Sequence, residues 1–179
     1  FGSVGEERYE PIISVGYFGD DWTELEFPCK PGSVHRRPCF CAPYHYRLDW
    51  NIWFLGFKPH KNMLRNREQW VYQLLAKLLI PGDASETKRP WLDLLDTTTS
   101  HYLQTTFYDK GRAPRYAKVD MYRYRMTGSL TTILTSSETM PWWNRTLTES
   151  LIPVVEWDPI RKRLKQVVFE KLPDFEFDI

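Results

Sequence analysis

The stretch AKVDMYRYRMT, residues 117–127, decides the fold class because it alternates two kinds of side chain over a full strand length. Tyr122, Tyr124 and Met126 fall on one side of an extended chain, since successive side chains of a strand point to opposite faces. The intervening arginines fall on the other side. This pattern predicts a strand whose aromatic face packs in the core and whose basic face meets solvent.

Two more segments near the start have the composition of strands. Residues 8–18, RYEPIISVGYF, are rich in β-forming side chains, and Pro11 indicates a sheet edge or a bulge. Residues 22–29 alternate after a turn at 19–21, so the two segments together predict a hairpin. A third extended segment is predicted over residues 34–42.

Residues 48–57, LDWNIWFLGF, are ambiguous, because an apolar run of this length fits a buried strand or a helix. Asp49 is suited to be an N-cap, and aromatic side chains recur at helical spacing. These features favour a helix whose apolar side is formed by Trp50, Trp53, Phe54 and Phe57.

Three other segments have helical patterns. Residues 69–80 carry two adjacent apolar rows at helical spacing and end at a Pro-Gly pair. Pro90 stands at the first turn of a short helix. Residues 159–179 are predicted to form a C-terminal helix followed by an acidic tail.

Helices inserted among separated strands, without the strand–helix–strand rhythm of a parallel sheet, predict an α+β fold. We expect an antiparallel β-sheet with intercalated α-helices. The chain has 179 residues, of which 16% are aromatic, so its length suits one domain over residues 1–179 with a sizeable core.

The charge balance and the apolar runs exclude two classes of protein. With 24 Lys+Arg against 23 Asp+Glu, the net charge of +1 argues against a nucleic-acid-binding protein, and the YRYR segment at 122–125 is better explained as a half-buried strand. The longest apolar run, 52–57, is far shorter than the roughly 20 residues that cross a bilayer. Because the chain begins at Phe1, we expect any targeting segment to be removed or to lie outside it.

Cys29, Cys39 and Cys41 are an odd number, which argues against a closed disulfide framework. Three alternatives remain for them. Either Cys39 or Cys41 could form a disulfide with Cys29, or all three could be reduced and buried. A zinc site with His35 and His45 is disfavoured, because zinc knuckles place two residues between paired ligands. We therefore predict no metal and no cofactor.

The sequence has no nucleophile elbow, phosphate loop, dinucleotide fingerprint or HExxH motif. His45 lies close to Asp49 and could act as a general acid or base in an esterase, but no serine or cysteine is evidently placed beside it. A buried cluster in which Arg36, Arg37 or Arg47 satisfies Asp49 and neighbouring carbonyl groups explains these residues better. The motifs therefore argue against a generic hydrolase.

Residues 144–146, NRT, form a sequon for N-linked glycosylation at Asn144. Such triplets are common by chance, so the sequon matters only if the chain enters the secretory pathway. In that case we expect an exposed loop beside Trp142 and Trp143.

The stretch RRPCFCAPYHYRLDWNIWF, residues 36–54, resembles the soluble C-terminal region of the lipase maturation factor family. The resemblance covers about residues 1–165, and Lys-Pro-Gly followed by Arg-Arg-Pro and Arg-Leu-Asp-Trp is its most specific part. Matching blocks are FGSV, RYEPIISVG and WTELEFPCKPG upstream, and QLLAKLL, APRYAKVDMYRYRMT, WWNR and LIP downstream. The family motif and its structural cluster fall on Arg36, Arg37, Pro38, His45, Arg47, Asp49, Trp50 and Trp53.

The resemblance implies a function. Members of this family are endoplasmic-reticulum membrane proteins that help homodimeric lipases fold and assemble, and their soluble C-terminal region faces the lumen. A non-catalytic protein-binding module is therefore expected, with a lipase client as its partner and membrane association through partners or a segment outside this chain. The alternative is a structural accessory subunit of a large membrane complex that has reused the fold, with an organellar (mitochondrial) membrane as the alternative location.

Overall fold

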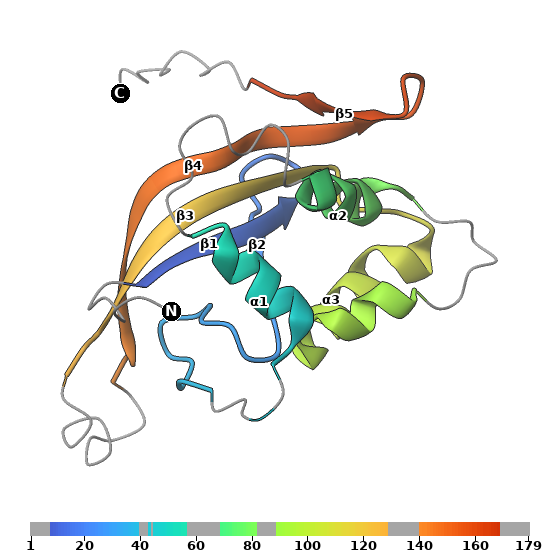
Figure 1. Cartoon of the computed structure of the whole chain (residues 1–179). Helices are drawn as coiled ribbons and strands as arrows, with labels where there is room; N and C mark the ends of the chain where they lie inside the picture. Colours follow the sequence, from blue (N-terminus) through green and yellow to red (C-terminus); the bar gives the residue numbers. More distant parts are fainter. Residues whose placement is uncertain are drawn as a thin grey trace, which may run out of the picture.

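The computed structural model describes residues 8–39, 43, 45–56, 69–81, 89–128 and 140–168 (Figure 1). Within these residues, an antiparallel sheet of five strands has the order β2-β1-β3-β4-β5. The strands are β1 (Arg8–Gly16), β2 (Thr23–Glu24), β3 (Tyr116–Met126), β4 (Trp143–Asp158) and β5 (Arg163–Gln166). The α-helices are α1 (Arg47–Phe54), α2 (Gln69–Leu79) and α3 (Thr97–Thr106), and the 3-10 helices are η1 (Pro90–Leu94) and η2 (Tyr108–Lys110). This architecture confirms the predicted α+β class.

The helices gather on one face of the curved sheet (Figure 1). The core lies between the two layers, where side chains of β1, β3 and β4 meet the inner faces of α1, α2 and α3. The residues at its centre include Ile13, Val15, Ile52, Leu75, Leu78, Leu103, Ala117, Val119 and Ile152. Burial of these apolar side chains holds the helices on the sheet.

The predicted hairpin and its proline are explained by the register of β1. β2 pairs with β1 only at Ser14 and Val15, whereas β3 pairs along the whole of β1. Pro11 therefore lies where, among the described residues, β1 has a strand neighbour on one side only, and its missing N–H is tolerated there. The turn before β2 is fixed by Asp21, whose Oδ1 accepts hydrogen bonds from the N–H groups of Tyr17 and Phe18.

Two predicted elements are corrected. Residues 34–39 of the third extended segment form no strand; instead, the carbonyl of Val34 accepts hydrogen bonds from the N–H groups of Trp142 and Trp143. The C-terminal helix is wrong where the structure describes it, because residues 163–166 are strand β5. Oδ1 of Asp158 accepts two N–H groups of the following turn, so the chain reverses and pairs with the end of β4. Residues 169–179 lie outside the described residues.

Candidate functional site

Helix α1 forms at the predicted place, but it starts at Tyr46 as N-cap, without a side-chain cap. Asp49 lies in its first turn and is buried, so the predicted capping role is corrected. The inner side of α1 is formed by Ile52 together with the following Leu55, both in the core. Trp50, Trp53 and Phe54, which were expected to form its apolar side, are instead less buried than these aliphatic neighbours, and Phe57 lies outside the described residues.

Five rings on and just before α1 form one surface, which we call the aromatic patch. Trp50 lies at its centre, with ring centroids 5.1 Å from His45, 5.2 Å from Trp53 and 5.3 Å from Phe54. Tyr46 and Phe54 are 53% and 48% exposed. Exposed apolar patches mark interaction sites, and aromatic side chains are enriched at the centre of protein interfaces. The members of the patch are His45, Tyr46, Trp50, Trp53 and Phe54.

A disulfide lies beside the patch. Cys29 is bonded to Cys39, and the N–H of Cys29 donates to Oδ2 of Asp49 at 2.7 Å. The disulfide settles the pairing that the sequence left open, and Cys41 lies outside the described residues. The hydrogen bond ties the segment after β2 to the first turn of α1, and the disulfide ties the same segment to Cys39.

Reduction of the Cys29–Cys39 disulfide is expected to lower the free energy of unfolding by about 2–3 kcal/mol, because the bond closes a short loop in the unfolded chain. Urea unfolding with and without reductant measures this change. A Cys29→Ser/Cys39→Ser variant should have the free energy of unfolding of the reduced protein, and reductant should not change it. Cys41→Ser should keep the response, and loss of the response in Cys41→Ser would contradict this pairing.

Beneath the patch lies a buried ion pair that the sequence analysis missed. Nζ of Lys30 lies 2.9 Å from Oε2 of Glu10, and the two side chains are 2% and 0% exposed. Arg8, which is half-exposed, contacts the other oxygen of Glu10 through its Nε and lies over the ring of Trp53. Burial lowers the pKa of Lys30, while the neighbouring Glu10 carboxylate raises it. One carboxylate thus pairs with two cations.

A cavity of about 170 Å³ opens between the patch and this ion pair. Its walls come from the start of β1, from the segment at the disulfide, and from α1 with the residues before it. The lining residues are Arg8, Cys29, Lys30, His45, Tyr46, Asp49, Trp50 and Trp53. Four residues of the family cluster predicted from the sequence therefore line one cavity: His45, Asp49, Trp50 and Trp53.

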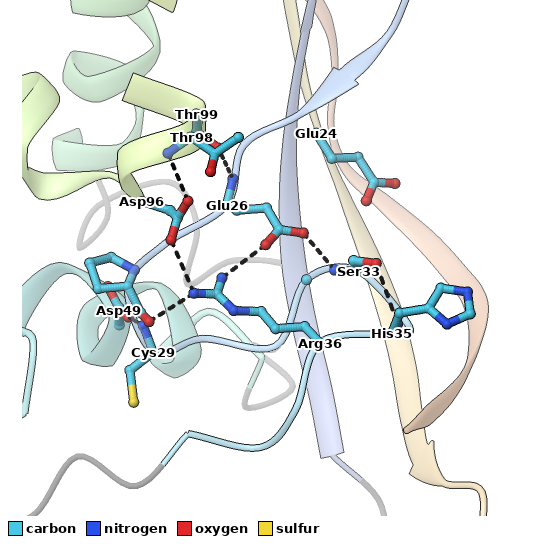
Figure 2. A network of polar contacts seen from close by, with 12 residues as sticks. Glu24, Glu26, Cys29, Ser33, His35, Arg36, Asp49, Asp96, Thr98 and Thr99 are labelled. Atoms are coloured by element: carbon cyan, nitrogen blue, oxygen red, sulfur yellow. Dashed lines mark hydrogen bonds and ion pairs between the residues drawn. The ribbon is translucent and has the colours of Figure 1, made fainter. Parts of the chain in front are cut away.

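Arg36 belongs to a separate network (Figure 2). Its guanidinium donates to Oε2 of Glu26 at 3.0 Å and to the carbonyl of Pro28 at 2.8 Å, and it lies 3.4 Å from Oδ2 of Asp96. Asp96 is the N-cap of α3, where its Oδ1 accepts the N–H of Thr98. Arg36 therefore joins the strand-β2 segment to a helix terminus and does not satisfy Asp49.

The remaining arginines of the predicted cluster also differ from the expectation. Arg37 lies over the ring of Trp142, 5.4 Å from its centroid, and Arg47 is exposed. Within the described residues, neither hydrogen-bonds to Asp49, so the predicted Arg–Asp pairing is wrong. Pro38 is exposed.

Asn144 is exposed in β4, opposite Arg125 of β3, so the sequon lies in a strand and not in the expected loop. Glycosylation at this position stays a prediction. Across the described ranges, no group of three or more His, Cys, Asp or Glu side chains could hold a metal ion. None of the helices in those ranges combines the length and apolarity needed to cross a bilayer.

Comparison with known proteins agrees with the resemblance seen in the sequence. The family model of the lipase maturation factor C-terminal domain matches residues 1–153. Lipase maturation factor 2 of Mus musculus is 31% identical over 160 residues, which are 89% of this chain and 20% of that protein. Lipase maturation factor 1 of Mus musculus is 35% identical over 133 residues, 71% of this chain and 20% of that protein.

The human lipase maturation factor 1 is 42% identical over 85 residues, 44% of this chain and 14% of that protein. The chain thus spans about a fifth or less of the length of these relatives. No solved structure matches it. Since the family model covers most of its residues, the chain belongs to the lipase maturation factor family, whose C-terminal domain it contains.

Proposed function

We propose that this chain is a non-catalytic protein-binding module that helps homodimeric lipases fold and assemble on the luminal side of the endoplasmic reticulum membrane. The aromatic patch is the single observation that carries the proposal. Interfaces are enriched in aromatic side chains, and energetically dominant contacts cluster around such residues. The names of the relatives support a lipase as the client.

Two further features support the luminal and non-catalytic parts of the proposal. The Cys29–Cys39 disulfide suits an oxidising compartment. Oδ2 of Asp49 accepts the amide of Cys29, and the ring of His45 stacks against Trp50. These contacts favour a structural use of both side chains over the acid–base pair of an esterase.

The proposal predicts rescue of lipase maturation. A chimera in which this chain replaces the matching region of mouse lipase maturation factor 1 is expected to restore active lipase dimers to cells lacking that factor. In the chimera, Tyr46→Ala/Phe54→Ala should reduce secreted activity several-fold, because it removes the two exposed large hydrophobic rings of the patch. The readouts are lipase activity in the medium and dimer content by sedimentation.

Phe18→Ala/Ile160→Ala is the matched control, because both residues are apolar, exposed and outside the patch. It should rescue as well as the unmodified chimera. A folded, correctly located chimera that restores no activity would overturn the proposal.

Native electrophoresis of membranes from the source organism gives an independent test of the proposal. Constant stoichiometry inside a large assembly without lipase would assign the chain to a structural subunit instead.

A further inference from the structure

A second hollow lies at the end of the sheet where β1 finishes and β3 begins. Tyr116, the first residue of β3, pairs with Gly16 of β1 and with Glu156 of β4. Beside these strand ends is a groove of about 570 Å³, whose walls also come from the end of α2 and from the segment between η2 and β3. It shares no lining residue with the cavity beside the aromatic patch. We call it the arginine groove, because Arg112 and Arg115 are the cations in its lining.

Rings and aliphatic side chains form the apolar part of this groove. Tyr17 and Trp157 are partly buried and pack against the main core, and Leu79 belongs to that core. Their positions are therefore set by the packing of the fold before anything binds. Ring surface that is only partly covered is favourable contact area for an apolar side chain of a partner.

The two arginines of the groove hold donors that no acceptor in the described part of the chain uses. The guanidinium of Arg112 has no hydrogen bond or ion pair in the ranges that the structure describes. Nε of Arg115 lies 3.7 Å from Oε2 of Glu156, which is longer than a hydrogen bond, and the Arg115 side chain is 60% exposed. The same carboxylate also lies 3.8 Å from Nζ of Lys165. Two arginines against one carboxylate leave the lining of the groove with a net positive charge.

The backbone that carries the arginines is fixed by hydrogen bonds. The N–H of Arg112 donates to the carbonyl of Phe107, and the N–H of Arg115 donates to the carbonyl of Gly16. Gly111 precedes them with a φ of 64°, which sets the turn between η2 and this segment. A ligand therefore has to order only the side chains of the arginines and not their backbone, which lowers the entropic cost of binding.

We propose that the arginine groove binds an extended segment of a partner protein in which acidic residues alternate with apolar ones. Successive side chains of an extended segment point in opposite directions, so its carboxylates can meet the arginines while its apolar side chains pack on Tyr17 and Trp157. Guanidinium and carboxylate groups form paired, charge-assisted hydrogen bonds, whereas the net positive lining disfavours a basic segment. A hollow receives a protruding chain, whereas a flat lipid surface would contact only its rim. The groove is a second binding surface, and its assignment does not depend on the lipase client of the aromatic patch.

Three peptides that differ in one property at a time test this assignment. The acidic probe is acetyl-Glu-Phe-Glu-Leu-Glu-amide, the neutral probe has Gln in place of each Glu, and the small probe has Ala in place of Phe and Leu. Titrated into the whole chain and followed by amide chemical shifts, the acidic probe should bind about fivefold or more tightly than either of the others. The shifts should move at Arg112, Arg115 and Trp157. The preference over the neutral probe should shrink at roughly 0.5 M salt, because salt screens exposed charges.

The other outcomes of the titration would each overturn the proposal. Equal binding of the acidic and neutral probes would remove the role of the arginines, and equal binding of the acidic and small probes would remove the role of the apolar wall. No binding of the acidic probe, or shifts confined to the aromatic patch, would show that the groove is not its site. Binding of the chain to phosphatidylglycerol vesicles without binding of the acidic probe would assign the arginines to a lipid surface instead.

Arg112→Gln/Arg115→Gln sharpens the test, because it removes both charges at exposed positions and keeps side chains of similar length. This variant should bind the acidic and neutral probes alike. Arg47→Gln/Arg125→Gln is the matched control, since it removes the same charge at exposed positions that do not line the groove. It should keep the preference for the acidic probe. A preference retained in the first variant, or lost in the control, would contradict the assigned arginines.

These outcomes are distinguishable from those of lipase rescue. The titration uses the chain without lipase, and Tyr46→Ala/Phe54→Ala, which is expected to impair rescue, should bind the acidic probe as the unmodified chain does. Binding of the acidic probe with no rescue removes the proposed function and keeps the groove. Rescue without binding of the acidic probe removes the groove and keeps the function.

Discussion

Glu10→Gln is expected to lower the free energy of unfolding by about 3–5 kcal/mol, because it leaves a buried ammonium without its counter-charge. Lys30 is 2% exposed at its side chain, and Glu10 is its only carboxylate within ion-pair distance among the described residues. Arg8 contacts the same carboxylate, so the substitution also leaves two cations facing each other. Urea unfolding at pH 7 measures the loss.

The same variant should show a characteristic pH dependence. Burial already lowers the pKa of Lys30, and Glu10 is the first of the groups that raise it again. Without Glu10 the pKa falls further below the ordinary 10.5 of the unfolded chain. The unfolded state then binds more protons than the folded state between the two pKa values, so stability rises with pH there. The deficit of Glu10→Gln should therefore shrink as the pH is raised toward 10.5.

Lys30→Met gives the matched comparison. This change removes the buried ammonium but leaves Glu10 paired with Arg8, which is partly in solvent. We expect a clearly smaller loss than in Glu10→Gln, and the double variant Glu10→Gln/Lys30→Met should recover much of the stability. A larger loss of stability in Lys30→Met than in Glu10→Gln would contradict this expectation. It would show that the Glu10 carboxylate needs Lys30 as its counter-charge more than Lys30 needs Glu10.

The fold could be predicted where the side-chain pattern reports burial. α2 follows its helical pattern because one face of the helix packs in the core. β3 forms at the predicted place, but the expected aromatic core face is corrected: Ala117 and Val119 belong to the main core, whereas Tyr124 packs in a second cluster with Ile12 and Trp143. Met126, which was expected in the core, is 41% exposed. β4 escaped prediction because most of its residues 144–150 are exposed, so hydrogen bonds to β3, and not apolar alternation, define that part. The C-terminal helix was wrong because Ile160 and Val168, which gave it a helical pattern, are 91% and 79% exposed.

The candidate site could be predicted only where its residues are close together in the sequence. Helical spacing correctly grouped Trp50, Trp53 and Phe54, because neighbours on a helix surface follow from sequence distance alone. The partners of Asp49 and Glu10 lie twenty residues away in each case, at Cys29 and Lys30. Only the tertiary fold brings such pairs together. A charged residue within the apolar run of β1 was the one available signal for the ion pair.

Gly56→Ala is the second large effect that we expect, with a loss of about 3 kcal/mol. A Cβ at this position would lie 2.4 Å from the carbonyl oxygen of Tyr9 and 3.0 Å from that of Trp53. Both contacts are backbone atoms, one in β1 and one in α1, so no side chain can rotate away. The added methyl group must therefore push α1 off the sheet. Urea unfolding should show a lower midpoint with an unchanged slope.

Gly111→Ala is the control that separates crowding from backbone strain. Gly111 has a φ of 64°, and a Cβ added there would have no other atom within 4 Å, so alanine meets only the left-handed strain of about 1 kcal/mol. A loss in Gly56→Ala no greater than in Gly111→Ala would show that α1 and β1 adjust freely. Both elements also line the cavity beside the aromatic patch, β1 through Arg8 and α1 through Asp49. Because the close contact at Gly56 sets how α1 lies against β1, Gly56→Ala is expected to change the shape of this cavity as well as the stability of the fold.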